Sequence, residues 1–507
     1  MNIATEGNAF MKMEFKRKAG VLLAVSSLPS PYGIGTFGKE AYVFVDKLAE
    51  ASQGYWQVLP LSPTSYGDSP YQALSAFAGN PYFIDLDELI KDGLLSESDV
   101  VDLKTVANEE YVDYENIYIK RYPVLRKAFA NWKTLQDIAA YEEFVKAQGE
   151  WLANYAFYMA LKGYFGQKEW ALWDEDIKCR KADALKHYEE LLRDDIAFYK
   201  FIQYKFFEQW NKLKKYANEK GISIIGDIPL YVAYDSADVW ANPKMFCLSE
   251  ELELTNVAGC PPDCFSEDGQ KWGNPLYDWK AHEEDDFNWW KARMKANTSL
   301  YDVIRIDHFI GMVRYYCIPH DKSAKSGWYE KGPGIKLINA INSVIGDSKI
   351  IAEDLGVTGP DVEELLEAAG YPGMKELDFA FDGDGSNTHL PHFHKKHSVV
   401  YIGTHDNETL VGHIKRASEK ELSYMMDYLG VSSIKDIPDA MFRILYMSVA
   451  DTVILQMQDI LGKDNSARMN FPSTLGDNWK WRMKKGEFDD KACEKLRKLA
   501  DTYNRRS

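Results

Sequence analysis

Short runs of β-branched and aromatic apolar residues recur along the chain, and helical patterns of apolar and polar positions separate most of them. Near-continuous apolar runs are typical of parallel strands that are buried on both faces. Eight such runs lie at residues 21–25, 55–59, 222–227, 303–307, 349–353, 377–381, 399–404 and 467–470. Eight strands that alternate with helices predict an α/β fold, a (β/α)8 TIM barrel with insertions. We take residues 1–507 as one barrel domain.

The longest insertion is expected at residues 86–220, between the second and third runs. This segment is strongly helical and much longer than a plain βα crossover requires. We predict a helical insertion subdomain whose last helix packs on the barrel. The apolar side of that helix contains Phe201, Gln203, Phe206, Phe207 and Trp210.

A second insertion is expected at residues 250–280. Its central part, residues 259–275, is rich in Gly, Pro, Asn and Asp and predicts an irregular loop. Phe265 and Trp272 lie within it. We interpret the segment as a mobile loop with aromatic tips that covers a ligand; an ordinary surface loop is the alternative.

Charge and composition narrow the range of partners. The chain has 60 Lys and Arg against 77 Asp and Glu, a net charge of −17. Binding to nucleic acid or to an anionic membrane requires a basic face, so neither partner is expected. Aromatic residues make up 14% of the chain, and flat aromatic faces can bind sugar rings. The lack of a membrane-length apolar run or a signal-peptide layout predicts a cytoplasmic protein.

Three patterns that could indicate a metal or a cofactor are weak. The cysteines are scattered, which favours reduced thiols over a zinc site. Four histidines crowd into residues 389–397 without a supporting cysteine, so we expect packing rather than metal binding. Residues 33–38 match G-x-G-x-x-G but lack the acidic residue expected about 20 positions later. We predict no metal and no cofactor.

The strongest chemical signal is a set of acids at strand ends, where TIM barrels carry their active sites. Four of the predicted strands run into Asp227, Asp307, Glu353 and Asp406. One such acid would mean little among 77 carboxylates, but four at adjacent or near-adjacent strand ends are hard to obtain by chance. The alternative is a set of helix caps and ion-paired rim acids.

The neighbours of these acids predict different roles. Arg305 lies two residues before Asp307, so both side chains point to one side of the strand, and the cation should lower the pKa of Asp307. Glu353 follows apolar residues with no adjacent cation, so its pKa should be raised, as a general acid requires. One anionic and one protonated carboxyl group on either side of a bond are what glycoside cleavage needs.

Motifs along nearly the whole chain resemble the 4-α-glucanotransferases, also called amylomaltases or disproportionating enzymes, a glycoside hydrolase family related to the α-amylases. The matching strings are YWQVLPL at 55–61, GDSPYQ at 67–72, GNP at 79–81, PPD at 261–263, GQKWGNP at 269–275, RIDHF at 305–309, AEDLG at 352–356, GTHDNET at 403–409 and GDNW at 476–479.

The resemblance implies Asp307 as nucleophile, Glu353 as general acid and base, and Asp406 as stabiliser of the transition state. It also implies a set of substrate-binding residues: Arg305, His308, His405, Asp227, Ser69, Tyr71, Gln270, Trp272, Asn274 and Tyr66. The implied reaction is a retaining transfer of α-1,4-glucan segments to the 4-hydroxyl of an acceptor glucan or glucose, through a covalent glycosyl-aspartate.

Two positions depart from many members of that family. The chain has Ala24 where they have His in the first strand, and Cys264 where they have Tyr in the covering loop. Two alternative functions stay open, an α-amylase-like hydrolase and a glucan-binding protein that has lost catalysis.

Overall fold

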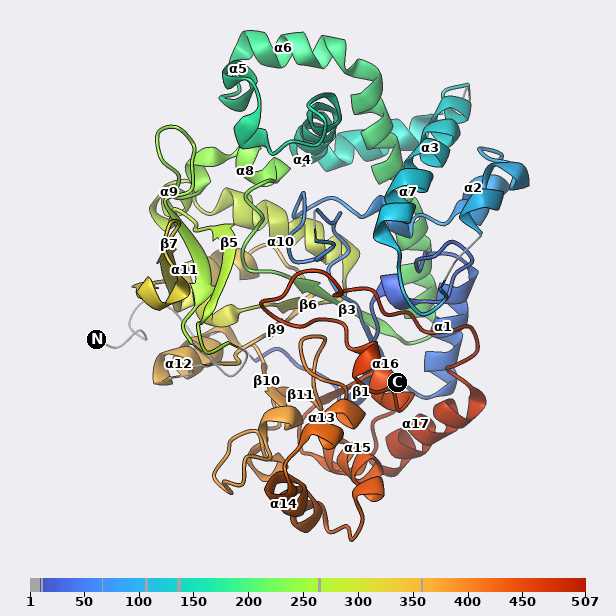
Figure 1. Ribbon diagram of the computed structural model, residues 1–507, viewed down its shortest axis with the longest axis vertical. Coiled ribbons are helices and arrows are strands. Elements are labelled where there is room, and N and C mark those ends of the chain that lie inside the picture. The colour runs from blue at the N-terminus through green and yellow to red at the C-terminus, as the bar shows by residue number, and fades with distance from the viewer. Residues whose placement is uncertain are drawn as a thin grey trace.

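The computed structural model describes residues 10, 12–65, 67–104, 108–134, 138–262, 266–356 and 359–507. Its centre is a parallel sheet of eight strands in the order β10-β11-β12-β1-β2-β3-β6-β9. Ala352 N at the end of β9 donates to Pro372 O, just before β10, at 3.0 Å, which brings the two edges of the sheet together. Helices surround these strands (Figure 1). The predicted (β/α)8 barrel is confirmed.

The barrel strands are short and almost entirely buried. Their bounds are β1 Lys18–Leu22, β2 Tyr55–Gln57, β3 Ser223–Ile228, β6 Val303–Ile306, β9 Lys349–Ala352, β10 Gly373–Glu376, β11 Ser398–Tyr401 and β12 Thr452–Gln456.

Two of the predicted strands were wrong. Residues 377–381 do not form the sixth strand: β10 ends at Glu376, and Leu377–Phe379 is a 3-10 helix. Residues 467–470 do not form the eighth, which is β12, Thr452–Gln456. β12 begins five residues after the amphipathic helix α15, Ile437–Met447. In the sequence, the apolar run of β12 therefore resembles a continuation of that helix. The first strand also begins three residues earlier than expected.

The segment between β2 and β3 contains six helices among its described residues: α2 Leu86–Lys91, α3 Tyr114–Trp132, α4 Ala139–Tyr164, α5 Glu175–Lys178, α6 Ala182–Leu191 and α7 Arg193–Glu219. Figure 1 shows α4, α5 and α6 together at one end of the molecule. That this segment is a subdomain of its own stays a prediction.

Helix α7 ties this segment to the barrel, as predicted. Phe201, Phe206 and Trp210 on its inner side are fully buried. The Gln203 side chain bonds to both the N–H and the C=O of Gly79, at 2.8 and 2.7 Å. Since Gly79 lies in the long connection after β2, α7 holds in place the segment that carries Ser69 and Tyr71.

The remaining helices follow the barrel strands. Their bounds are α1 Lys39–Glu50, α8 Ala237–Ala241, α9 Trp279–Glu284, α10 Asn288–Leu300, α11 Ile335–Asn342, α12 Pro360–Ala369, α13 Leu410–Arg416, α14 Glu419–Leu429, α15 Ile437–Met447, α16 Met457–Ile460 and α17 Asp490–Thr502. No helix in the described part of the chain is long and apolar enough to cross a membrane. The cytoplasmic location stays a prediction.

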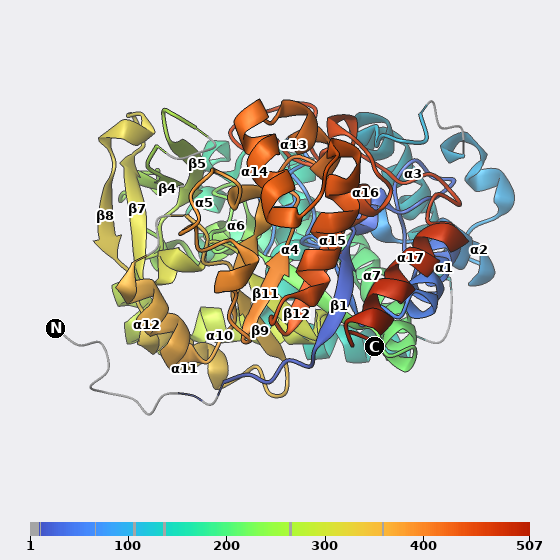
Figure 2. The ribbon, with the colours of Figure 1, turned by 90° about the horizontal axis from the view of Figure 1, so that it is seen from below.

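A second, antiparallel sheet replaces part of the loop expected at residues 259–275. Its order is β5-β4-β7-β8, with β4 Asn256–Cys260, β5 Gln270–Pro275, β7 Arg314–Pro319 and β8 Trp328–Lys331. It lies at one side of the barrel (Figure 2). The turn-forming residues predicted a loop where the structure has β5. Gly273 has a positive φ of 80° inside this strand, and the pairing of β4 with β5 is irregular. Phe265 lies outside the described residues.

The barrel wall depends on glycine where two strands approach closely. A Cβ atom at Gly20 of β1 would lie 2.5 Å from Tyr55 Cβ and 2.6 Å from Tyr55 O on β2. We expect Gly20→Ala to lower the free energy of unfolding by about 2–3 kcal/mol, because the two strands would have to separate. Urea unfolding followed by circular dichroism measures this.

The matched control is Gly163→Ala in α4, where an added Cβ meets nothing within 4 Å. That change should be neutral or stabilise by up to about 1 kcal/mol, since alanine favours helix. Equal stability of the two variants would contradict the packing of β1 against β2.

Candidate active site

One guanidinium group joins two of the acids at the carboxyl ends of neighbouring strands. Arg305 Nη1 lies 2.8 and 2.7 Å from the two carboxylate oxygens of Asp227 and 3.0 Å from Asp307 Oδ1. The side chains of Asp227 and Arg305 are 0% and 3% exposed, whereas that of Asp307 is 27% exposed. Asp227 is therefore a buried anchor for Arg305, and Asp307 is the acid that faces open space.

The pKa of Asp307 differs from our expectation. Burial raises it above the ordinary value for aspartic acid, and Arg305 lowers it only in part. The charges of Asp227 and Asp406 add to the rise. The nearest cation alone predicts a lowered pKa for Asp307, but a buried site with several acids opposes the charged form more strongly than one guanidinium favours it.

Glu353 is fixed in place by backbone groups. It follows β9 directly and is 8% exposed. His308 N donates to Oε2 at 2.7 Å and Leu355 N donates to Oε1 at 2.9 Å. His308 adopts a left-handed backbone with φ of 53°, which is the local turn that presents its N–H.

Glu353 is also the acid whose surroundings favour the protonated form. Burial raises its pKa, and the charge of Asp307 raises it further. Arg305 and the two backbone N–H groups oppose this rise. The direction predicted from the sequence is confirmed. The adjacent Asp354 points elsewhere, since its Oδ1 accepts from Met374 N at 2.6 Å.

Asp406 is held by two residues of the segment predicted as the eighth strand. Asn470 Nδ2 donates to Asp406 Oδ1 at 2.6 Å, and Arg468 Nη2 donates to the backbone oxygen of Asp406 at 2.6 Å. His405 Nε2 lies 3.4 Å from Asp406 Oδ2. Asp406 is therefore positioned by an irregular segment after α16, and sequence reasoning missed both Arg468 and Asn470.

Tyr71 connects the loop of residues 67–72 to the acids. Its ring stacks on that of His405, with centroids 5.1 Å apart and an interplanar angle of 14°. Its hydroxyl donates to Asp227 Oδ2 at 2.9 Å. Ser69 Oγ accepts from Tyr71 N at 3.2 Å, so Ser69 shapes the turn that presents the ring.

Strand β5 carries Trp272 to the site and is tied to the residue after Tyr71, since Gln72 Nε2 donates to Trp272 O at 3.1 Å. The indole ring lies edge-on to His308, with centroids 4.8 Å apart, and its Nε1 donates to Gln270 Oε1 at 3.1 Å. Asn274 Nδ2 donates to Val232 O at 2.9 Å, so this side chain ties β5 to the barrel. The predicted site residue Tyr66 lies outside the described residues.

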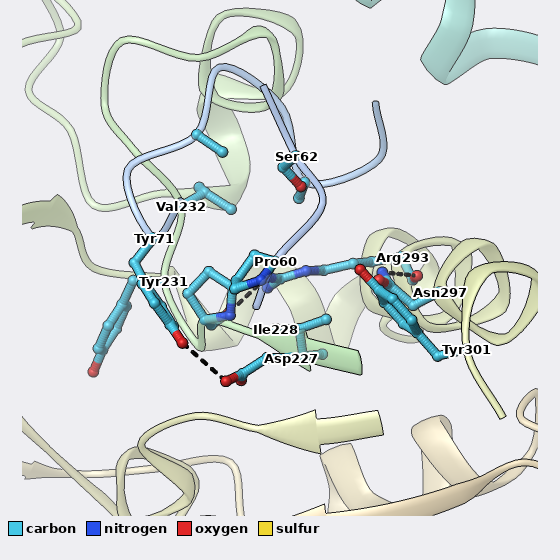
Figure 3. Close-up of a pocket in the computed structure, with 13 residues that line it drawn as sticks. Pro60, Ser62, Tyr71, Asp227, Ile228, Tyr231, Val232, Arg293, Asn297 and Tyr301 are labelled. Carbon is cyan, nitrogen blue, oxygen red and sulfur yellow. Dashed lines mark hydrogen bonds between the residues drawn. The ribbon is translucent and has the colours of Figure 1, made fainter. Parts of the chain in front are cut away.

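A pocket of about 350 Å³, including open solvent at its mouth, lies behind Tyr71 and Asp227. Figure 3 shows the Tyr71 hydroxyl pointing to Asp227. Arg293 lies beside Asn297 in the lining of the same pocket. Asp307, Glu353 and Asp406 do not line this pocket. It therefore borders the acids and is not the space that they enclose.

The structure thus brings the sequence-predicted acids together around Arg305, with aromatic rings on two sides. The profile of glycoside hydrolase family 77, described as 4-alpha-glucanotransferase, matches residues 23–488. The chain belongs to family 77, the 4-alpha-glucanotransferases. The resemblance found in the sequence motifs is confirmed.

Two similar proteins are covered along nearly their whole length, and a more distant one shares the fold. A 4-alpha-glucanotransferase of Clostridium butyricum is 47% identical over 484 residues, covering 95% of this chain and 99% of that protein. The amylomaltase of Streptococcus agalactiae, solved in complex with acarbose, has a TM-score of 0.94 at 41% identity and is covered completely, over 97% of this chain. The amylomaltase of Corynebacterium glutamicum, at 17% identity and a TM-score of 0.78, shares the fold; the match covers 96% of this chain and 75% of that one.

The histidine-rich segment of this family 77 chain is occupied with internal contacts. His394 is 7% exposed and lies between Ser448 Oγ and His389 O, at 2.8 and 3.0 Å. His397 Nε2 lies 3.1 Å from Gly370 O. Among the described residues, no three His, Cys, Asp or Glu side chains are grouped so that they could hold a metal ion.

Asn470 offers a test of how this family 77 site positions Asp406. Asn470→Ala removes the donor to Asp406 Oδ1, so we expect kcat to fall roughly ten- to a hundredfold, because small misplacements of a reacting group are costly. The assay is 4-alpha-glucanotransferase turnover, with circular dichroism as the check on folding.

Asn116→Ala on α3 serves as the control, since Asn116 is half-buried and far along the chain from the acids. Unchanged turnover in Asn470→Ala would mean that Asp406 does not depend on this contact.

Proposed function

We propose that this chain transfers α-1,4-glucan segments from a donor malto-oligosaccharide to the 4-hydroxyl of an acceptor glucan or of glucose. The observation that carries the proposal is the arrangement of Asp307, Glu353 and Asp406 around Arg305 in a chain of family 77. The named activity of the full-length relatives and the acarbose complex of the Streptococcus agalactiae protein support it.

The proposed reaction proceeds in two displacements with retention. Glu353 donates its proton to the glycosidic oxygen while Asp307 attacks the anomeric carbon; the bond to the leaving sugar breaks and a glycosyl-aspartate forms. Glu353, now anionic, takes the proton of the acceptor 4-hydroxyl, whose oxygen displaces Asp307. Asp406 stabilises the positive charge that develops on the sugar in both steps.

The electrostatics described above suit these two roles. Arg305 touches Asp307, so Asp307 is the more readily ionised of the pair. Among the described residues, the hydrogen bonds that Glu353 accepts come from backbone N–H groups, and Glu353 is more deeply buried, so it retains a proton more readily. Once Asp307 is bonded to the sugar its charge is lost, and the pKa of Glu353 falls, as a switch from acid to base requires.

The substrate contacts are assigned by position. Arg305, His308, His405 and Tyr71 are proposed to contact the sugar next to the bond that breaks, and Asp227 to hold Arg305 and Tyr71. A further set acts at more distant sugars or shapes the loops there: Ser69, Gln270, Trp272, Asn274 and Tyr66. Trp272 is proposed to cover the acceptor side and keep out water, the competing acceptor.

Incubation of the purified chain with maltotriose tests the proposal. A transferase yields glucose together with a ladder of longer glucans, whereas an α-amylase-like hydrolase yields only shorter products. Chromatography of the products separates these outcomes. Products no longer than maltotriose would support the hydrolase, and an unchanged substrate would support a binding protein without catalysis.

The covering role of Trp272 can be measured as a ratio. Trp272→Ala should lower the ratio of transfer to hydrolysis several-fold, because water gains access when the indole ring is removed. Glucose release and chain elongation are followed together on maltotriose. Trp328→Ala on β8, at a side chain that is 43% exposed, is the matched control and should leave the ratio unchanged. An unchanged ratio in Trp272→Ala would remove this role.

A further inference from the structure

Gln72 directly follows Tyr71, and the proposed reaction gives its side chain no part. The backbone around Gln72 is fixed by local hydrogen bonds. Ser65 Oγ donates to Gln72 O at 2.9 Å, and Gln72 N donates to Ser69 O at 3.2 Å. The side chain therefore extends from a turn whose position is well defined.

The Gln72 side chain bonds to two residues of strand β5. Its Nε2 donates to Trp272 O at 3.1 Å and to Asn274 Oδ1 at 2.8 Å, and its Oε1 accepts from Asn274 Nδ2 at 3.3 Å. Asn274 Nδ2 also donates to Val232 O at 2.9 Å, in the connection after β3. This pair of amides joins three segments that lie far apart in the chain.

The contacts use every polar atom of the two amides and leave one orientation for each. An amide side chain has two N–H donors and one carbonyl acceptor. Rotating the Gln72 amide by 180° would place its oxygen against Trp272 O and Asn274 Oδ1, which are both acceptors. Asn274 could not compensate, because its nitrogen faces Val232 O, another acceptor. The pairing therefore requires an N–H donor at position 72.

Gln72 bonds to β5 where this strand is least supported by its own sheet. β5 lies at the edge of the second sheet and pairs there with β4. The pairing is regular at Gln270 and Lys271 and resumes at Pro275, so residues 272–274 lie opposite a bulge. Asn274 in this stretch is 4% exposed, and a buried polar group that loses its partner retains its desolvation cost.

The 67–72 loop, on one side of the amide pair, is tied to the proposed nucleophile. The Tyr71 hydroxyl donates to Asp227, which accepts from Arg305 Nη1. The same nitrogen lies 3.0 Å from Asp307 Oδ1. The loop is therefore fixed relative to Asp307 by buried polar contacts.

Strand β5, on the other side, is in contact with the residue that orients the proposed acid. The Trp272 indole lies edge-on to the His308 ring, with centroids 4.8 Å apart. His308 N donates to Glu353 Oε2 at 2.7 Å. The place of the indole beside His308 depends on how residues 272–274 are held.

We propose that Gln72 is a positioning residue: its amide fixes the bulged part of β5 to the 67–72 loop and so keeps the Trp272 indole beside His308, which favours transfer over hydrolysis. The inference rests on the proposed function, in which Trp272 keeps water away from the glycosyl-enzyme.

The test is Gln72→Glu, which keeps the size of the side chain and replaces the Nε2 donor by an acceptor. A carboxylate oxygen would then face Trp272 O and Asn274 Oδ1, so β5 should open more often. Hydrogen–deuterium exchange followed by mass spectrometry should be at least about threefold faster over residues 270–275 and unchanged over β7.

Activity on maltotriose shows whether Gln72 acts through the indole. Gln72→Glu should lower the ratio of transfer to hydrolysis roughly three- to fivefold. In the Trp272→Ala background it should change the ratio by less than about 1.5-fold, because two changes that act through one group are not additive. A purely structural role would lower the ratio equally in both backgrounds.

Two further variants secure the comparison. Gln167→Glu makes the same chemical change at an exposed residue after α4 and should alter neither the exchange nor the ratio. Gln72→Met applies if Gln72→Glu does not fold, because it removes the same hydrogen bonds without adding a charge, and it should change both readouts in the same direction.

Unchanged exchange over residues 270–275 in the Gln72 variants would overturn the inference. An equal ratio change with and without the Trp272 indole would overturn it as well. Failure of the proposed function gives a different result: wild type would form no glucans longer than maltotriose, whereas the exchange measurement would still show whether Gln72 holds β5.

Discussion

The contact of one buried guanidinium with two carboxylates organises this active site. Arg305 Nη1 lies within 3.0 Å of both Asp227 and Asp307; Asp227 of β3 is in register with Arg305 of β6, and Asp307 directly follows β6. Removing a partner from a buried ion pair leaves an uncompensated charge and is strongly destabilising. Asp227 therefore fixes Arg305, and Arg305 fixes the orientation and charge of Asp307. Tyr71 joins the group through Asp227, which ties the loop of residues 67–72 to it.

Glu353 and Asp406 are held in place by groups other than the Arg305 guanidinium. Glu353 accepts hydrogen bonds from two backbone N–H groups, and Asp406 accepts one from the Asn470 amide. A low-dielectric site that held four anions beside one cation could not remain stable. The division into ionised and protonated carboxyls is thus a requirement of the packing, and it is also what glycoside chemistry needs.

Much of this site could be predicted from local pattern. Asp227, Asp307 and Glu353 each follow a run of buried apolar residues, so the strand and its end are visible together. The end of β10 could not, because this strand alternates and its buried positions are Met374 and Glu376, while the more apolar run lies after it. Asn470 and Arg468 lie in irregular backbone whose position depends on the tertiary fold, and no local spacing specifies their contact with Asp406. The sequence of β5, in which Gly273 adopts a left-handed conformation, likewise predicts a loop.

The central claim is that Asp307, held by Arg305, is the residue that bonds to the sugar. The most direct measurement uses Glu353→Gln with α-maltotriosyl fluoride, whose leaving group needs no acid, so that the second displacement lacks its base and the intermediate accumulates. Peptide mass spectrometry then locates the glycosyl group. A maltotriosyl ester on Asp307 is the predicted result. An ester on Asp406 or Asp227, or fluoride release with no adduct on any peptide, would contradict the account.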